Sequence, residues 1–150
     1  MAQQAKVLPL GEESEIRQMF EEFEQAMRAK DIERIMSFYA PETVAFDMMP
    51  PLRFLGKDQY RKSWEKGFEM MQGDWDFEQR DLNVQVSGSL AFCHALNHAR
   101  GTLKDGENVD TWMRWTCCLR KIDGNWQIVH EHNSVPIDME SEKAVWNLKP

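Results

Sequence analysis

The sequence is poor in cysteine, and its three cysteines do not form a disulfide framework. Cys117 and Cys118 are direct neighbours and Cys93 stands alone, so the count is odd and the spacing is not that of a small secreted domain. This usage predicts a reducing compartment, and the expected location is cytoplasmic.

Long apolar runs and positive charge are also scarce. No apolar run approaches the roughly 20 residues of a membrane helix. The N-terminal MAQQAKVLPLGEE has no apolar stretch long enough for a signal peptide. Lys and Arg total 18 against 25 Asp and Glu, which gives a net charge of −7. Because a nucleic-acid binder needs a basic face and no Lys/Arg cluster is present, we expect neither a membrane nor a nucleic acid as partner.

The motifs of common cofactor and nucleophile sites are missing as well. The sequence has no P-loop, no glycine fingerprint of a dinucleotide-binding fold, no Gly-x-Ser-x-Gly and no Cys-x-x-Cys. We therefore predict no cofactor.

The residues that are present suit one compact domain. The 150 residues are 42% hydrophobic and include six Trp, eight Phe and ten Met, which is enough for a single core. We expect a flexible tail over residues 1–11, one domain over residues 12–140 and a C-terminal tail over residues 141–150.

Apolar spacing predicts three helices in the first half of the chain. Helical periodicity covers residues 13–29. Asp31 has the position of an N-cap for a short helix that reaches Tyr39, and Gly56 and Asp58 open a third helix. The stretch TVAFDMM is predicted to be a short strand before this third helix.

The second half of the chain has the pattern of an antiparallel sheet. After Gly73 the segments WDFEQRDLNVQV, LAFCHALNHARGTL and VDTWMRWTCCLRK are predicted strands, and a last strand follows the hairpin signal at residues 123–124. Helices followed by a meander indicate an α+β fold, in which three N-terminal helices pack in a strongly curved antiparallel sheet.

Asp47 is the best candidate for a catalytic base. It stands in the apolar stretch VAFDMMPPLRFLG, where partial burial would raise the pKa of its carboxyl and suit it to accept a proton. The alternative is a surface Asp before a turn, or an ion-pair partner of Arg53.

Two histidines of the last strand are candidates for a metal site. His130 and His132 are two residues apart, so both point to one face. Gly124 followed by His-x-His resembles the start of the cupin metal motif, but no acidic ligand has the required spacing. We predict no metal and place both imidazoles on the outer face of the sheet. The alternative is a metal site at His130 and His132, to which His94 and His98 of a neighbouring strand could contribute.

The hairpin turn decides which side chains share the inner face of the sheet. A two-residue turn at residues 123–124 puts Arg114, Thr116, Glu131 and Asn133 on one face. A three-residue turn with a bulge instead places Glu131 and Asn133 with the alternate set Met113, Trp115 and Cys117. The sequence leaves both registers open.

The order of elements and the last hairpin resemble the nuclear transport factor two-like fold over about residues 12–137. The closest likeness is to SnoaL-like domains, whose late hairpin runs Arg-x-Thr, a basic residue, Asp-Gly-x-Trp and His-x-His-x-Ser. The matching residues here are Arg114, Thr116, Arg120, Asp123, Gly124, Trp126, His130, His132 and Ser134. The superfamily with this fold includes ketosteroid isomerase and scytalone dehydratase. The association domain of the calcium/calmodulin-dependent kinase has a similar C-terminal hairpin.

The resemblance implies a pocket between helices and sheet, with Asp47 at the position of the isomerase base. In that isomerase a tyrosine and a protonated Asp donate hydrogen bonds to the oxyanion. The position of the tyrosine corresponds to Phe23 here, and that of the protonated Asp falls near Cys117, so both donors are replaced. His98, Arg114 and Tyr39 are the donors expected in their stead. The residues expected to line or form the pocket are Phe23, Tyr39, Trp64, His98, Arg114, Trp115, Cys117, Glu131 and Asn133.

The function expected is binding of a small hydrophobic ligand, in an isomerase, cyclase or dehydratase. The alternatives are a non-catalytic ligand-binding or association module, and thirdly a His-x-His metal enzyme. Trp112, Trp115, Trp126 and Ile128 cannot all point into one pocket, so an outer apolar patch and a C2 homodimer through the sheet are expected.

Overall fold

The computed structural model describes residues 11–150, so the expected N-terminal tail lies, apart from residue 11, outside the described residues. In the described part, helices α1 (Glu12–Arg28), α2 (Ile32–Ser37) and α3 (Lys57–Glu69) lie in the first half of the chain. The Asp31 cap is confirmed, because its carboxylate accepts the backbone N–H of Arg34 at 3.1 Å. None of the described helices is long and apolar enough to cross a membrane.

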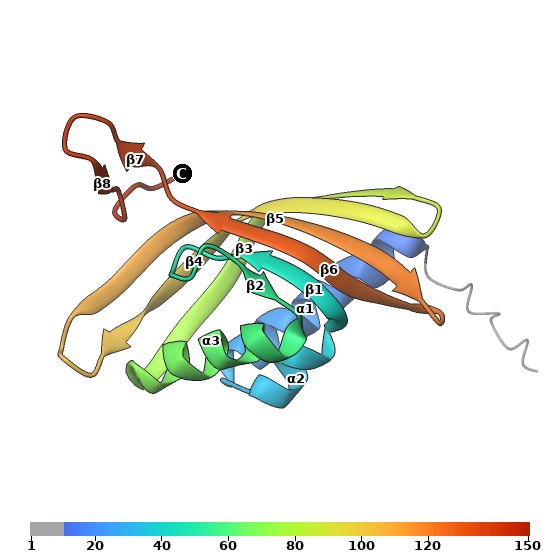
Figure 1. Cartoon of the computed structure of the whole chain (residues 1–150), viewed down its shortest axis with the longest axis horizontal. Coiled ribbons are helices and arrows are strands. Elements are labelled where there is room, and N and C mark those ends of the chain that lie inside the picture. Colours follow the sequence, from blue (N-terminus) through green and yellow to red (C-terminus); the bar gives the residue numbers. More distant parts are fainter. Residues whose placement is uncertain (1–10) are drawn as a thin grey trace, which may run out of the picture.

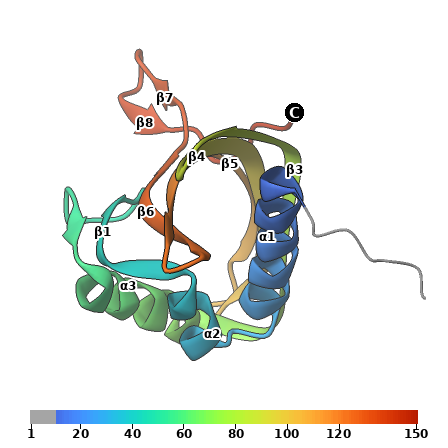
Figure 2. The same ribbon diagram turned by 90° about the vertical axis from the view of Figure 1, so that its right-hand side faces the viewer.

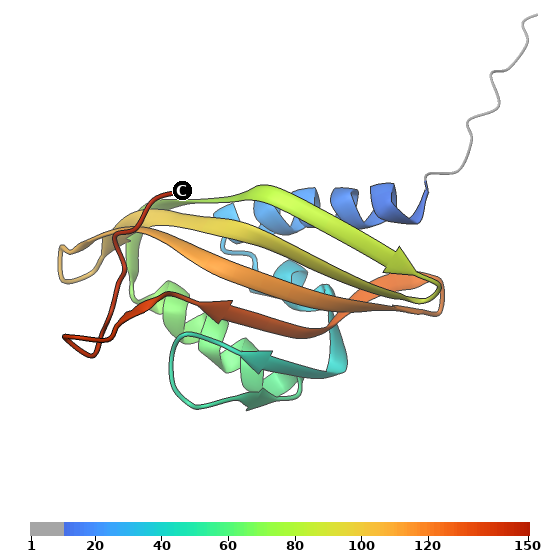
Figure 3. The ribbon, with the colours of Figure 1, turned by 90° about the horizontal axis from the view of Figure 1, so that it is seen from above.

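Six strands form one sheet in the order β2-β1-β6-β5-β4-β3 (Figure 1). The strands are β1 (Tyr39–Phe46), β2 (Phe54–Leu55), β3 (Met71–Ser87), β4 (Leu90–Leu103), β5 (Asn108–Ile122) and β6 (Asn125–Ser134). All neighbours are antiparallel except β1 and β6, which run parallel. Figure 3 shows β3 to β6 as long strands side by side.

The sheet curls strongly, and the helices close its concave side (Figure 2). The predicted α+β fold with helices packed in a curved antiparallel sheet is thus confirmed. Gly101 of β4 permits the close approach of β3 in this curved sheet. A Cβ at this position would lie 2.6 Å from Met71 Cε and 2.9 Å from Trp75 Cβ, so only glycine lets β3 pass so close.

The prediction that the second helix reaches Tyr39 is wrong. Helix α2 ends at Ser37, and Tyr39 begins β1. The physical reason is Pro41, which has no backbone N–H and disfavours helical geometry in the residue before it. The pairing of β1 with β6 is irregular between Tyr39 and Val44, where this proline stands, so its missing donor breaks no regular ladder.

The inner face of the sheet packs against the apolar stripe of α1. Ile16, Phe20, Phe23 and Met27 of this stripe are each at most 2% exposed. The ring of Phe20 meets Trp115 of β5 edge to face, with centroids 5.0 Å apart. Each such buried side chain contributes about 1.5–3 kcal/mol to folding, so this contact holds α1 over the sheet. Trp115, together with Phe23 and Met27 of α1, also lines the cavity described below.

The register of β5 and β6 combines parts of both predicted alternatives. The turn has two residues, Asp123 and Gly124, with φ of 49° and 81°, as a type I′ hairpin requires. Farther along, Leu119 pairs with Ile128 but Cys118 pairs with His130, so Val129 is an extra, bulged residue. Beyond this bulge the side chains of β6 exchange faces relative to β5.

The chain after Pro136 leaves the sheet and forms a small arm. Strands β7 (Ile137–Asp138) and β8 (Lys143–Ala144) pair with each other only. The arm stands on the side of the sheet opposite the helices (Figures 1 and 2). The segment expected to be a C-terminal tail, residues 141–150, therefore contributes one strand of the arm.

Candidate functional site

A cavity of about 210 Å³ lies between the helices and the concave face of the sheet. Six elements and the segment after β1 supply its walls. Helix α1 contributes Phe23 and Met27, and α3 contributes Tyr60, Ser63 and Trp64. The sheet contributes Trp75, Phe77, Asn97, Met113, Trp115, Glu131 and Asn133, and the segment after β1 contributes Asp47, Met48 and Met49. Met49 is 53% exposed, so the cavity reaches the surface beside it.

Glu131 of β6 is the most unusual residue of this cavity, because it is a carboxylate that is only 1% exposed. Three donors from three elements converge on it. The hydroxyls of Tyr39 (2.9 Å) and Tyr60 donate to Oε1, and the indole Nε1–H of Trp115 donates to Oε2 at 3.1 Å. This set of donors satisfies a carboxylate whose burial would otherwise be costly.

The electrostatics of this cluster keep the two tyrosine hydroxyls around Glu131 neutral. Burial raises the pKa of Glu131, the hydrogen bonds from Tyr60, Trp115 and Tyr39 oppose this rise, and the charge of Asp47 adds to it. Burial first, and then the charge of Glu131, raises the pKa of both tyrosines well above 10.0. Both hydroxyls therefore keep their protons and remain donors to Glu131 at physiological pH.

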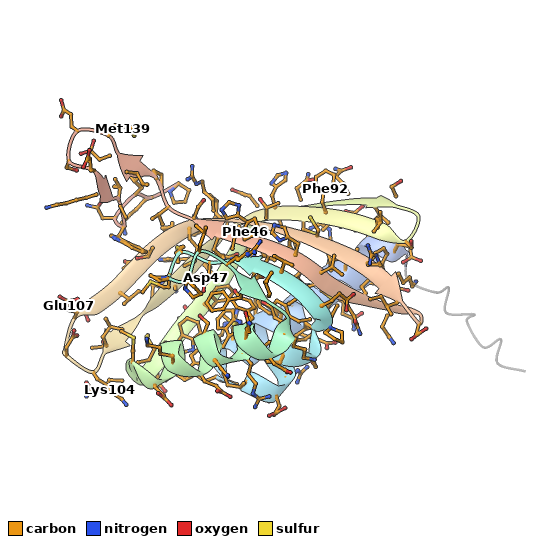
Figure 4. The ribbon with its side chains drawn as sticks, in the orientation of Figure 1. Phe46, Asp47, Phe92, Lys104, Glu107 and Met139 are labelled. Atoms are coloured by element: carbon orange, nitrogen blue, oxygen red, sulfur yellow. The ribbon has the colours of Figure 1, made fainter. Side chains whose placement is uncertain are left out.

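Asp47 follows the last residue of β1 and lies on the helix side of the sheet (Figure 4). Its side chain is half-buried and lines the cavity. Burial raises the pKa of its carboxyl, while hydrogen bonds from the backbone N–H of Met48 and the side chain of Ser63 oppose the rise. The Met48 N–H lies 2.8 Å from Oδ1. A carboxyl of this kind has the properties of a proton acceptor at near-neutral pH.

The structure brings most of the predicted site residues together. Asp47, Phe23, Trp64, Trp115, Glu131 and Asn133 line the cavity. Tyr39 and Cys117 are buried behind its wall, where Tyr39 acts through its bond to Glu131 and Cys117 lies opposite Glu131 in the β5–β6 pair.

His98 and Arg114 do not line the cavity, and their expected role as donors in it is corrected. His98 stacks on Trp112 with ring centroids 4.1 Å apart, and its nitrogens lie 3.1 Å from Glu78 and 2.6 Å from Asp110. Arg114 is exposed and donates to Ser134 Oγ at 3.1 Å. The reason is strand parity, because both residues alternate with inward-facing neighbours of the same strand.

The bulge at Val129 explains which residues of β6 reach the cavity. It aligns Glu131 with Cys117 and Asn133 with Trp115, so both β6 residues point inward. If Val129 paired with Cys118 in a regular ladder instead of bulging, Glu131 would pair with Thr116, face outward and be lost from the site.

The two histidines of β6 lie on the outer face of the sheet. His132 is exposed, and His130 donates from Nδ1 to the carbonyl of Val44 at 2.7 Å. Both rings pack on Phe46, with centroids 4.8 and 5.6 Å away. Within residues 11–150, no three His, Cys, Asp or Glu side chains are grouped so as to hold a metal ion.

Sequence reasoning missed the part that Tyr60 has in the site. Tyr60 lies in the segment predicted to be the third helix and was not among the expected pocket residues, yet its hydroxyl donates to Glu131 and its ring packs on Trp64, with centroids 5.7 Å apart. The signal in the sequence was the spacing of Tyr60 and Trp64, which puts both on one helix face.

A curved sheet closed by three helices, with an apolar cavity and two acidic groups inside, defines an α+β domain of the NTF2-like, cystatin-like class. A family model described as a SnoaL-like domain matches residues 16–138, and the chain belongs to this family. None of the curated proteins matches the chain.

Solved structures agree with this assignment. An NTF2-like protein of unknown function from Pseudomonas putida KT2440 is 43% identical, with a TM-score of 0.84 over 92% of this chain and 96% of that one. A ketosteroid isomerase-like protein from Erwinia carotovora atroseptica SCRI1043 is 24% identical, with a TM-score of 0.71 over 83% and 97% of the two chains. A protein from Xanthomonas campestris assigned as a calcium/calmodulin-dependent protein kinase II association domain is 20% identical, with a TM-score of 0.71 over 89% and 94%. The last two show a shared fold.

Proposed function

We propose that the cavity binds a small, largely apolar molecule and that Asp47 acts on it as a general base, in an isomerisation, cyclisation or dehydration. The observation that carries this proposal is a half-buried carboxylate with a raised pKa at the wall of an apolar cavity. The likeness of the fold to a ketosteroid isomerase-like protein supports it as an analogy.

Proton abstraction next to a carbonyl builds negative charge on oxygen, and the cavity offers amide donors for it. Asn97 and Asn133 both line the cavity. Asn97 is 4% exposed, and its Oδ1 accepts the Nε2–H of Gln79 at 3.1 Å, which leaves its N–H₂ for other partners. Donors fixed in this way stabilise charge that develops during a reaction.

The proposal is tested by titrating Asp47 with NMR. Because burial raises the pKa of its carboxyl, we expect a value above the ordinary 3.8. Asp58, an exposed residue at the start of α3, serves as the comparison in the same spectra. An ordinary pKa for Asp47, together with free access of solvent to its carboxyl, contradicts its assignment as base.

The outer face of the sheet supports a second candidate function, association of two copies of the chain. Phe46, Leu90 and Phe92 are 38%, 52% and 50% exposed there, and Figure 4 shows Phe46 and Phe92 on the side away from the helices. Of the four apolar residues expected to divide between two faces, Trp115, Trp126 and Ile128 are buried and Trp112 is half-buried beside His98. We propose a C2 homodimer through this face, as most homo-oligomers are dimers of this symmetry.

Light scattering at high protein concentration tests this dimer. We expect the mass of two chains, and the mass of a single chain rules out the dimer.

A further inference from the structure

The cavity has an unbalanced charge. Two carboxylates, Asp47 and Glu131, line it, whereas among residues 11–150 no Lys, Arg or His side chain does so. The three groups bonded to Glu131 are neutral donors, and the nearest charge acting on it is the like charge of Asp47. A buried carboxylate is ordinarily paired with a cation, and a cationic ligand would supply the partner that these two groups need when they are ionised.

The remaining walls are aromatic rings and methionines. Tyr60 packs on Trp64 with centroids 5.7 Å apart, and Trp75 packs on Phe77 at 5.9 Å. All four rings line the cavity, together with Trp115. The faces of such rings carry partial negative charge and attract cations, and cages of this composition recognise organic ammonium groups.

From this arrangement we propose that the ligand of the cavity is an organic ammonium compound with a compact apolar body. This proposal rests on the proposed function, because it names the class of molecule that the same site receives. The ammonium group lies among the rings near Asp47 and Glu131, and the apolar body contacts the methionines Met27, Met48 and Met113.

The size of the cavity limits the ligand. An apolar cavity of about 150 Å³ holds one benzene molecule. A cavity of about 210 Å³ therefore holds a single ring with a trimethylammonium-sized head group, and it excludes rigid skeletons of four fused rings.

Binding of a cation should strengthen as the pH rises, because a bound ammonium favours the ionised carboxylates. The groups that face Glu131 are Tyr39 of β1, Tyr60 of α3, and Trp115 and Cys117 of β5. Burial raises the pKa of the Cys117 thiol and of both hydroxyls, so these neighbours stay neutral throughout the range in which the two carboxyl groups titrate.

The proposal is tested with two probes of the same shape, phenyltrimethylammonium and tert-butylbenzene, which differ in charge. Each is titrated into the full-length protein at pH 8 and at pH 5, with the indole N–H signals of Trp64 and Trp115 followed by NMR. We expect the cation to bind at least about tenfold more tightly than the neutral probe at pH 8, and this ratio to fall at pH 5.

Variants identify which carboxylate is responsible for the preference for the cationic probe. Asp47→Asn and Glu131→Gln keep side-chain size and remove charge, and at least one of them should reduce the preference for the cation about tenfold. Asp58→Asn, which removes an exposed carboxylate from α3, should leave it unchanged. Equal or tighter binding of the neutral probe, binding of neither probe, or a preference retained in both cavity variants overturns the proposal. Such a result would not contradict Asp47 as the base, because that assignment is tested separately by the NMR titration of its carboxyl.

Discussion

Replacing Asp47 by Asn should lower the rate of the proposed proton abstraction by about 10²–10⁴-fold, the usual contribution of a general base. Asn cannot accept the substrate proton, but it has the size of Asp and can still accept the N–H of Met48 that Asp47 binds at 2.8 Å. The substituted cavity therefore keeps its shape, so that ligand affinity changes far less than turnover.

Exchange of carbon-bound hydrogen for deuterium provides the assay. A panel of small ketones, with and without an ammonium group, is incubated with the protein in D₂O and followed by NMR. The variant Asp58→Asn is the matched control, because it makes the same chemical change at an exposed position of α3. Exchange that survives in the Asp47→Asn protein but depends on another residue would remove Asp47 from the mechanism.

The same substitution should stabilise the fold at neutral pH. Burial raises the pKa of Asp47 above 3.8, so the folded state favours its protonated form. Stability from such a group is present below the unfolded-state pKa and is lost as the pH rises through the folded-state pKa. Asn is neutral at every pH and avoids this loss. Loss of activity with equal or greater stability is the pattern of a site that sacrifices stability for function.

Truncation of Glu131 to Ala should lower the free energy of unfolding by about 3–5 kcal/mol, which is large for a single substitution. The change leaves Tyr39, Tyr60 and Trp115 with buried donors that have lost their acceptor. A buried donor without a partner costs about 1–3 kcal/mol. Removing a carboxylate whose burial is unfavourable offsets part of this loss, so the total stays below the simple sum.

Urea denaturation measures the effect of this truncation. Glu107→Ala is the control, since Glu107 is exposed at the tip of the β4–β5 hairpin (Figure 4), and its expected effect is within about 0.5 kcal/mol. Glu131→Gln should fall between the two, because its amide oxygen still accepts from the tyrosines. If Glu131→Ala is as stable as the control, the three hydrogen bonds contribute nothing net to folding.

The elements of this fold could be predicted from the sequence because each has a local signal. The apolar spacing of α1, the Asp31 cap and the Asp123-Gly124 turn each depend on residues that are close together in the sequence. Tyr39 shows the limit of this approach. Its apolar ring fits the spacing of the preceding helix, but Pro41 ends the helix early and shifts Tyr39 into a strand.

The site was less predictable because its geometry depends on pairings between distant segments. Asp47 could be found as a cavity residue, since Met48 and Met49, its apolar neighbours in the sequence, line the cavity with it. The cluster at Glu131 joins residues 92, 71 and 16 positions apart, and no local pattern reports such contacts. His98 and Arg114 were placed on the wrong side of the sheet because the sequence does not state which face of each strand points inward.

The bulge at Val129 implies a rule for insertions and deletions in this family. Because Val129 has no partner on β5, a chain without this residue would still pair Leu119 with Ile128 and Cys117 with Glu131. Relatives that are one residue shorter here can therefore carry the same buried carboxylate. An alignment that places no gap at Val129 would then assign the wrong residue to its position.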